Sequence, residues 1–225
     1  MKKTKALSLL LSLLLLLSSL TLPLLAVDAE TAADPEQTQT DSADAPAEDD
    51  SVPEDRLLSS RTSFSVAAKA ALLIDLNTGR AVYEQDADER VYPASLTKIM
   101  TCLLALENGN LSDVVTVSAS ALDDLDADSS VAGLQVGEQM TLENLLYCMM
   151  VVSGNDACNV IAEHIAGSVA DFVRMMNQRA YELGCLNTHF SNPHGLHDES
   201  HYTTARDLSI ITQAALKSEN FRQIV

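Results

Sequence analysis

The sequence has few aromatic and few basic residues, and the shortage of basic residues argues against some classes of binding partner. Its 225 residues include no tryptophan and only 4% aromatic residues, and 14 Lys and Arg stand against 32 Asp and Glu, for a formal net charge of −18. A chain this acidic is a poor partner for nucleic acid or for an anionic membrane surface. We therefore expect no nucleic-acid partner. The hydrophobic share of 47% is ordinary for one globular domain.

The sequence also lacks the regular cysteine spacing of a disulfide framework. It has four cysteines, and Cys102 and Cys148 lie inside apolar runs with helical periodicity. Cysteines in such runs are typical of buried free thiols, so we favour these over disulfides.

Zinc-binding motifs are absent as well. His194, His197 and His201 crowd near Asp198 and could form a metal cluster, but the sequence contains no H-E-x-x-H. Because proline and glycine flank His194, we interpret this segment as a structural loop.

The first 29 residues are typical of a cleaved export signal. Three lysines occur among the first five residues, an apolar core of about 15 residues follows, and small residues stand at Ala26 and Ala29. A membrane anchor is the alternative, but the apolar run is shorter than the ~18 to 20 residues of a span before Pro23 interrupts it. We therefore expect an exported protein of the cell envelope.

An acidic segment separates this signal from the rest of the chain. Residues 28–55 hold eleven acidic residues, three prolines and no basic residue. Such a segment buries too little apolar surface to offset its chain entropy. We interpret residues 30–60 as a disordered linker and residues 61–225 as the folded domain.

The folded domain has the pattern of an α+β protein. Residues 70–85 predict a β-hairpin with Gly79 in its turn, and residues 113–117 predict a short isolated strand. Apolar residues at spacings of three and four predict helices over residues 141–152, 156–166, 169–183 and 203–217. Gly184 marks the end of the third of these helices.

Ser95 and Lys98 stand at the start of an apolar helical run. Pro93 favours a helix start, and the residues that follow are apolar on every side, so the helix is expected to cross the core. Burial near the positive end of a helix would lower the pKa of Lys98 and make it a usable base for Ser95. A helix cap beside a lysine with an exposed head is the simpler interpretation of this spacing alone.

A second polar group, Ser153-Gly154-Asn155, lies between two apolar helices. A helix-capping turn explains it structurally, and a hydroxyl with an amide at such a turn also suits substrate binding and proton relay. With S-x-x-K and S-x-N both present, the sequence resembles the penicillin-recognising serine enzymes. It is most similar to the D-alanyl-D-alanine carboxypeptidases among the low-molecular-mass penicillin-binding proteins. The segments that carry this likeness are "LLIDLNTGRAVYEQDADERVYPASLTKIMT", "VSGNDA", "FSNPHGLHDE" and "HYTTARDLSII".

The resemblance implies a serine β-lactamase/transpeptidase-like fold and a role for each motif residue. Ser95 would be the nucleophile that removes the terminal D-alanine of a peptidoglycan stem peptide through an acyl-enzyme, and Lys98 would be its general base. Ser153 would relay protons, and Asn155 would bind the substrate amide. The loop at residues 192–196 would border the site. No metal or organic cofactor is implied, and β-lactam antibiotics would be covalent inhibitors.

One departure from the family pattern is large. No K-T-G follows Ser153, although in the family this motif lies on a later strand of the sheet. We therefore expect a truncated chain that lacks the C-terminal strands, is inactive alone, and has lost any segment for peripheral membrane association. A β-lactamase and a degenerate peptidoglycan-binding module are the alternatives. The first lacks an assignable deacylating glutamate, and the second would have no chemical reason to keep all four site residues.

Overall fold

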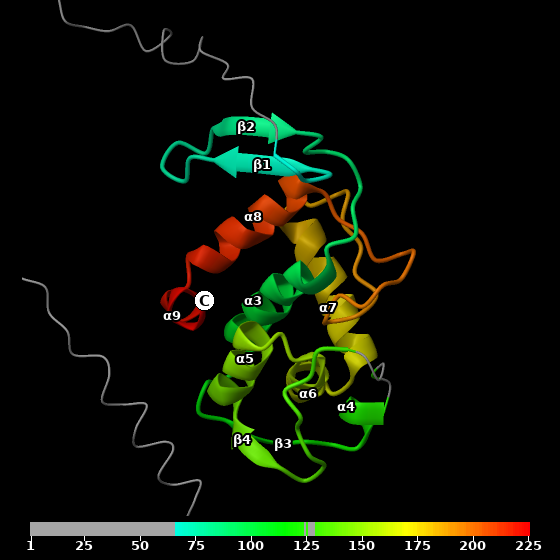
Figure 1. Ribbon diagram of the computed structural model, residues 1–225. Helices are drawn as coiled ribbons and strands as arrows, with labels where there is room; N and C mark the ends of the chain where they lie inside the picture. The colour runs from blue at the N-terminus through cyan, green and yellow to red at the C-terminus, as the bar shows by residue number, and fades with distance from the viewer. Residues whose placement is uncertain (1–65, 124, 126–128) are drawn as a thin grey trace, which may run out of the picture. The chain divides into compact units, whose positions relative to one another are not determined.

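The computed structural model describes residues 66–123, 125 and 129–225 (Figure 1). The predicted export signal and the predicted acidic linker lie outside these residues. Within the described part of the chain, no helix combines the length and the apolar character that crossing a bilayer requires.

The predicted hairpin is confirmed. Strands β1 (Ala71–Ile74) and β2 (Ala81–Gln85) pair antiparallel, with Ala71 opposite Gln85. Gly79 has a φ of 70°, a left-handed conformation that glycine adopts without strain, and its N–H donates to the carbonyl of Asp75 at 2.8 Å. Strand β1 packs on a later helix, α8 (Ala205–Leu216), and so ties the hairpin to the helical part (Figure 1).

Helix α3 (Lys98–Asn108) runs through the middle of the helical part (Figure 1). It contacts the helices that surround it: α5 (Leu142–Val151), α6 (Asn155–Ala166), α7 (Val169–Glu182), α8 and α9 (Glu219–Ile224). Its residues Met100 to Ala105 are all buried, as expected for a helix that is apolar on every side. The first turn of this central helix is therefore held rigidly by its neighbours.

Some helix boundaries differ slightly from those predicted. Helix α8 begins at Ala205, two residues later than predicted, because the Thr204 hydroxyl accepts the N–H of Asp207 at 3.0 Å and Thr203 is paired with Val91. Helix α6 begins at Asn155, one residue earlier than predicted. Helix α7 is followed by Gly184 with a φ of 85°, as predicted for its end.

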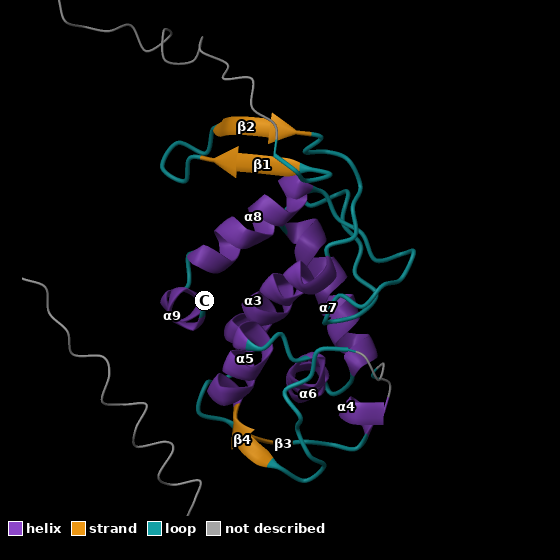
Figure 2. Cartoon of the chain, viewed as in Figure 1, coloured by secondary structure: helices purple, strands orange, loops and turns teal. Residues whose placement is uncertain are grey.

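The strand predicted within residues 113–117 is confirmed, but the prediction that it is isolated is wrong. Strand β3 (Val114–Thr116) pairs antiparallel with β4 (Gln139–Thr141), so that, in the described part of the chain, two pairs of strands flank the helices (Figure 2). The partner strand lies directly before α5, where helical periodicity masks it, and the Thr141 hydroxyl caps that helix. Two short helices, α4 (Ser120–Asp123) and α9, were also not predicted. Segments this short give no readable period.

Candidate active site

Ser95 and Lys98 meet at the start of the central helix. Ser95 lies in a 3₁₀ turn, η1 (Ala94–Thr97), and Lys98 is the first residue of α3. The Lys98 Nζ lies 3.3 Å from Ser95 Oγ, within hydrogen-bond distance. Lys98 is 3% exposed, as expected for a lysine at the start of a helix that crosses the core, whereas Ser95 is exposed. A reachable hydroxyl thus stands beside a buried amine.

Among the described residues, every hydrogen-bond partner of the Lys98 amine is neutral. Besides Ser95, it donates to Asn155 Oδ1 at 2.8 Å and to the His194 carbonyl at 2.9 Å. Burial lowers the pKa of Lys98 below its ordinary value. The nearby Cys158 thiol does not offset this, because burial raises the pKa of Cys158 to about 12 and keeps it uncharged at neutral pH. The surroundings therefore favour the neutral amine.

Ser153 completes the cluster from the junction of α5 and α6. Its hydroxyl donates to Ser95 Oγ at 2.9 Å. The φ of Ser153 is 61°, a left-handed conformation that costs a residue with a side chain about 1 to 2 kcal/mol. Such conformations persist where the surrounding structure fixes them, and they concentrate at functional sites. Hydrogen bonds thus join all four site residues predicted from the sequence into one cluster.

Asp156 fixes this strained junction. Its buried carboxylate accepts the backbone N–H groups of Ala132 and Gly133, both at 2.8 Å, and of Leu134 at 3.1 Å. A Cβ on Gly154 would lie 2.8 Å from Asp156 Oδ1, so only glycine fits between Ser153 and Asn155 at this packing distance. The sequence motif indicates the turn, but nothing in it indicates that residues 132–134 support it.

The loop at residues 192–196 lies against the first turn of α3. The Thr101 hydroxyl donates to the Pro193 carbonyl at 2.6 Å, one turn beyond the contact between Lys98 and the His194 carbonyl. Gly195 has a φ of 95°, and a Cβ there would overlap the Ala94 carbonyl. The family resemblance predicts a loop at the border of the site, but the contribution of a backbone carbonyl to Lys98 carries no sequence signal.

The histidines near this loop each make a different contact. Among residues 66–123, 125 and 129–225, no three His, Cys, Asp or Glu side chains gather as metal ligands. His194 Nδ1 accepts the N–H of Leu196 at 3.2 Å, His201 Nε2 lies 2.7 Å from Thr97 Oγ1, and the His197 ring packs edge-on against Tyr92 at 4.6 Å. Their contacts are those of a structural loop.

All four cysteines are free thiols. Cys102, Cys158 and Cys185 are buried, and burial raises the pKa of each to about 12. These thiols are therefore protonated and unreactive at neutral pH.

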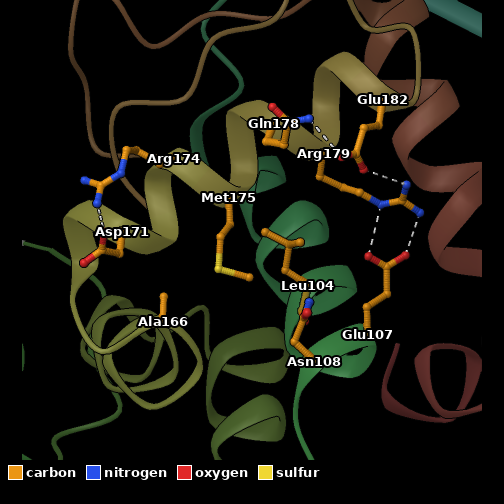
Figure 3. Close-up of a pocket in the computed structure, with 10 residues that line it drawn as sticks. All are labelled: Leu104, Glu107, Asn108, Ala166, Asp171, Arg174, Met175, Gln178, Arg179 and Glu182. Atoms are coloured by element: carbon orange, nitrogen blue, oxygen red, sulfur yellow. Dashed lines mark hydrogen bonds and ion pairs between the residues drawn. The ribbon is translucent and has the colours of Figure 1, made fainter.

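A pocket of about 720 Å³ lies between the far end of α3 and α7 (Figure 3). Arg179 forms a bidentate ion pair with Glu107 across it, and Leu104 and Met175 contribute apolar lining. At about 1.5 Å of rise per residue, Glu107 stands roughly 14 Å along α3 from Lys98. This pocket is therefore separate from the Ser95 cluster.

Comparisons with known proteins identify the family of this chain. A sequence profile described as D-alanyl-D-alanine carboxypeptidase matches residues 57–224. The D-alanyl-D-alanine carboxypeptidase DacF of Bacillus subtilis is 43% identical over 162 residues, which cover 68% of this chain and 40% of that protein. DacA of Escherichia coli is 38% identical over 160 residues, again 68% of this chain and 40% of that protein. The chain thus spans about 40% of the length of these curated relatives.

Solved structures give the same result for the fold. A variant of a Streptomyces DD-transpeptidase superposes with a TM-score of 0.68 at 36% identity, over 72% of this chain and 65% of that one. Penicillin binding protein 5 from Haemophilus influenzae superposes with a TM-score of 0.65 at 39% identity, over 69% of this chain and 47% of that one. The predicted α+β, transpeptidase-like fold is confirmed. By sequence and by fold, the chain belongs to the D-alanyl-D-alanine carboxypeptidase family.

Proposed function

We propose that this protein is a serine-type D-alanyl-D-alanine carboxypeptidase that forms its acyl-enzyme on Ser95. The observation that carries the proposal is the placement of an exposed Ser95 hydroxyl 3.3 Å from the amine of buried Lys98 and 2.9 Å from the Ser153 hydroxyl. Family membership supplies the reaction class, and this cluster supplies residues able to perform it.

The contacts of Lys98 suit a general base. A neutral amine has two N–H groups and one lone pair. Two of its partners, Asn155 Oδ1 and the His194 carbonyl, are acceptors only, so they take both N–H groups. The lone pair then faces the third partner, Ser95 Oγ, which can donate its proton. In this arrangement Lys98 accepts the Ser95 proton as Ser95 Oγ attacks the carbonyl of the penultimate D-alanine.

The remaining roles follow from position. Ser153 is hydrogen-bonded to Ser95 Oγ and would relay the proton that Lys98 has accepted to the nitrogen of the departing D-alanine. Asn155 would orient Lys98 and bind the substrate amide, and the Ser95 N–H would be one oxyanion-hole donor. Water would then hydrolyse the ester on Ser95. Every step uses side chains and backbone groups of the protein, and we propose no cofactor.

The proposed partners and location follow from the reaction. The substrate would be the stem peptide of peptidoglycan ending in D-alanyl-D-alanine, and β-lactams would acylate Ser95 as covalent inhibitors. Because peptidoglycan lies outside the cytoplasm, we propose an exported protein of the cell envelope, with residues 1–29 as signal, 30–60 as linker and 61–225 as catalytic domain. A peripheral membrane contact belongs to the same proposal.

Release of D-alanine from a synthetic peptide ending in D-alanyl-D-alanine tests this function. The protein is expressed from its full reading frame, and Ser95→Ala is compared with Ser112→Ala, which removes an exposed loop serine bonded to Asn110 instead. We expect release by the wild type and Ser112→Ala but not by Ser95→Ala. Continuous turnover of penicillin with no release of D-alanine would indicate a β-lactamase, and binding of the peptide without either reaction would indicate a binding module.

A further inference from the structure

His201 contacts the turn that carries Ser95. Its Nε2 lies 2.7 Å from Thr97 Oγ1, and the two residues are 2% and 0% exposed. Thr97 stands between Ser95 and Lys98 in the S-x-x-K motif. We propose that His201 is a positioning residue, which through Thr97 holds the Ser95 turn in the orientation that acylation needs. This inference depends on the proposed function of Ser95.

The hydrogen bonds define the tautomer of His201. The backbone N–H of Ser191 donates to His201 Nδ1 at 3.0 Å, so Nδ1 carries a lone pair and the ring proton is on Nε2. Nε2–H therefore donates to the Thr97 hydroxyl. Burial lowers the pKa of His201 to about 4, so this neutral tautomer persists at neutral pH.

The Ser95 turn needs support from outside itself. Thr97 joins η1 to α3 with a helical φ of −50° and ψ of −35°, and its hydroxyl makes no bond to a backbone N–H of the first turn. Pro93 provides no side-chain cap for η1, and Ala94 has a φ of 48°, a conformation that costs energy for a residue with a side chain. The hydrogen bond from His201 to the Thr97 hydroxyl is a tertiary contact that supports this turn from outside.

His201 is itself fixed by the backbone on its C-terminal side. Tyr202 exchanges two backbone hydrogen bonds with His189, at 2.8 and 2.9 Å. Thr203 does the same with Val91, again at 2.8 and 2.9 Å. Val91 lies four residues before Ser95, so the imidazole and the nucleophile turn share one rigid frame. An imidazole ring held in this position can fix the orientation of the Thr97 hydroxyl.

The test measures the acylation rate constant and the noncovalent dissociation constant for penicillin separately, on protein from the full reading frame. His201→Ala should lower the rate constant about 10- to 100-fold, the loss expected from a small misplacement of a reacting group, and leave the dissociation constant close to that of the wild type. His201→Gln retains an N–H donor toward Thr97 and should restore most of the rate. The matched control, His189→Ala, removes an exposed histidine of the same bridged segments and should acylate normally.

Thr97→Val tests the same hydrogen bond from its other side, because this substitution removes the hydroxyl with little change of shape. It should slow acylation as much as His201→Ala, and the double variant should be no slower than either single one. Should His201→Ala fail to fold, normal acylation by His201→Gln with slow acylation by Thr97→Val would support the inference. Normal acylation by a folded His201→Ala or by Thr97→Val would overturn it. A wild type that is never labelled on Ser95 would instead refute the proposed function, and this inference with it.

Discussion

Gly195→Ala should destabilise the protein and disturb Ser95 together. A side chain at a φ of 95° costs about 1 to 2 kcal/mol in backbone strain. The added Cβ would also overlap the Ala94 carbonyl and stand 2.9 Å from Thr97 Oγ1. Because backbone on both sides must move, we add about 1 to 3 kcal/mol for overpacking. The free energy of unfolding should therefore fall by about 2 to 5 kcal/mol.

Gly137→Ala is the matched control for this substitution. Gly137 has a φ of 84°, but a Cβ there would meet no atom within 4 Å, so the variant incurs the backbone strain alone. Urea unfolding of both variants, with penicillin labelling of the folded protein, separates the two contributions. We expect Gly195→Ala to lose stability beyond the control and to acylate more slowly. Equal stability losses with normal labelling would show that the loop at residues 192–196 does not press on the Ser95 turn.

Three further predictions concern buried polar groups. Lys98→Ala should lower the acylation rate by about 10² to 10⁴ while the protein stays folded, and near-normal labelling would mean that another group is the base. Burial lowers the pKa of His194 and of His201 from 6.5 to about 4. Between pH 6.5 and pH 4 the unfolded state therefore binds more protons than the folded state, so the free energy of unfolding should fall as the pH drops through this window. The loss should reach about 3 kcal/mol for each histidine. His201→Gln should weaken this pH dependence of urea unfolding, and an unchanged dependence would contradict the assignment. Asp156→Ala should lower the free energy of unfolding by at least about 3 kcal/mol, because it leaves three loop N–H groups without their acceptor, and a loss below about 1 kcal/mol would show that water replaces it.

Local patterns in the sequence were enough to predict the hairpin and the end of helix α7. The hairpin follows from the turn at Gly79, and the end of α7 follows from Gly184, because both glycines have the positive φ that such turns require. Strand β4 could not be predicted, since three residues give no period and its partner β3 lies more than twenty residues earlier in the chain.

The candidate site, like the fold, could be predicted from the sequence only in part. Ser95, Lys98, Ser153 and Asn155 stand in two short motifs, and both motifs are legible in the sequence. One further partner of Lys98 is not legible there, because it is a backbone atom: Lys98 donates to the carbonyl of His194. The contact between His201 and Thr97 joins side chains 104 residues apart, and only the folded chain shows that they meet. Sequence motifs thus indicate the reacting groups, whereas their positioning depends on tertiary contacts.

The site of covalent labelling by penicillin tests the central claim most directly. Trypsin cleaves after Arg90 and after Lys98, so Ser95 falls in the short peptide of residues 91–98. Ser153 falls in a different peptide, residues 99–174, which makes the two serines separable by mass. Mass spectrometry of the digest after labelling should place the adduct on residues 91–98. An adduct on residues 99–174, or none on protein that is folded and expressed from its full reading frame, would contradict the assignment of Ser95 as the nucleophile.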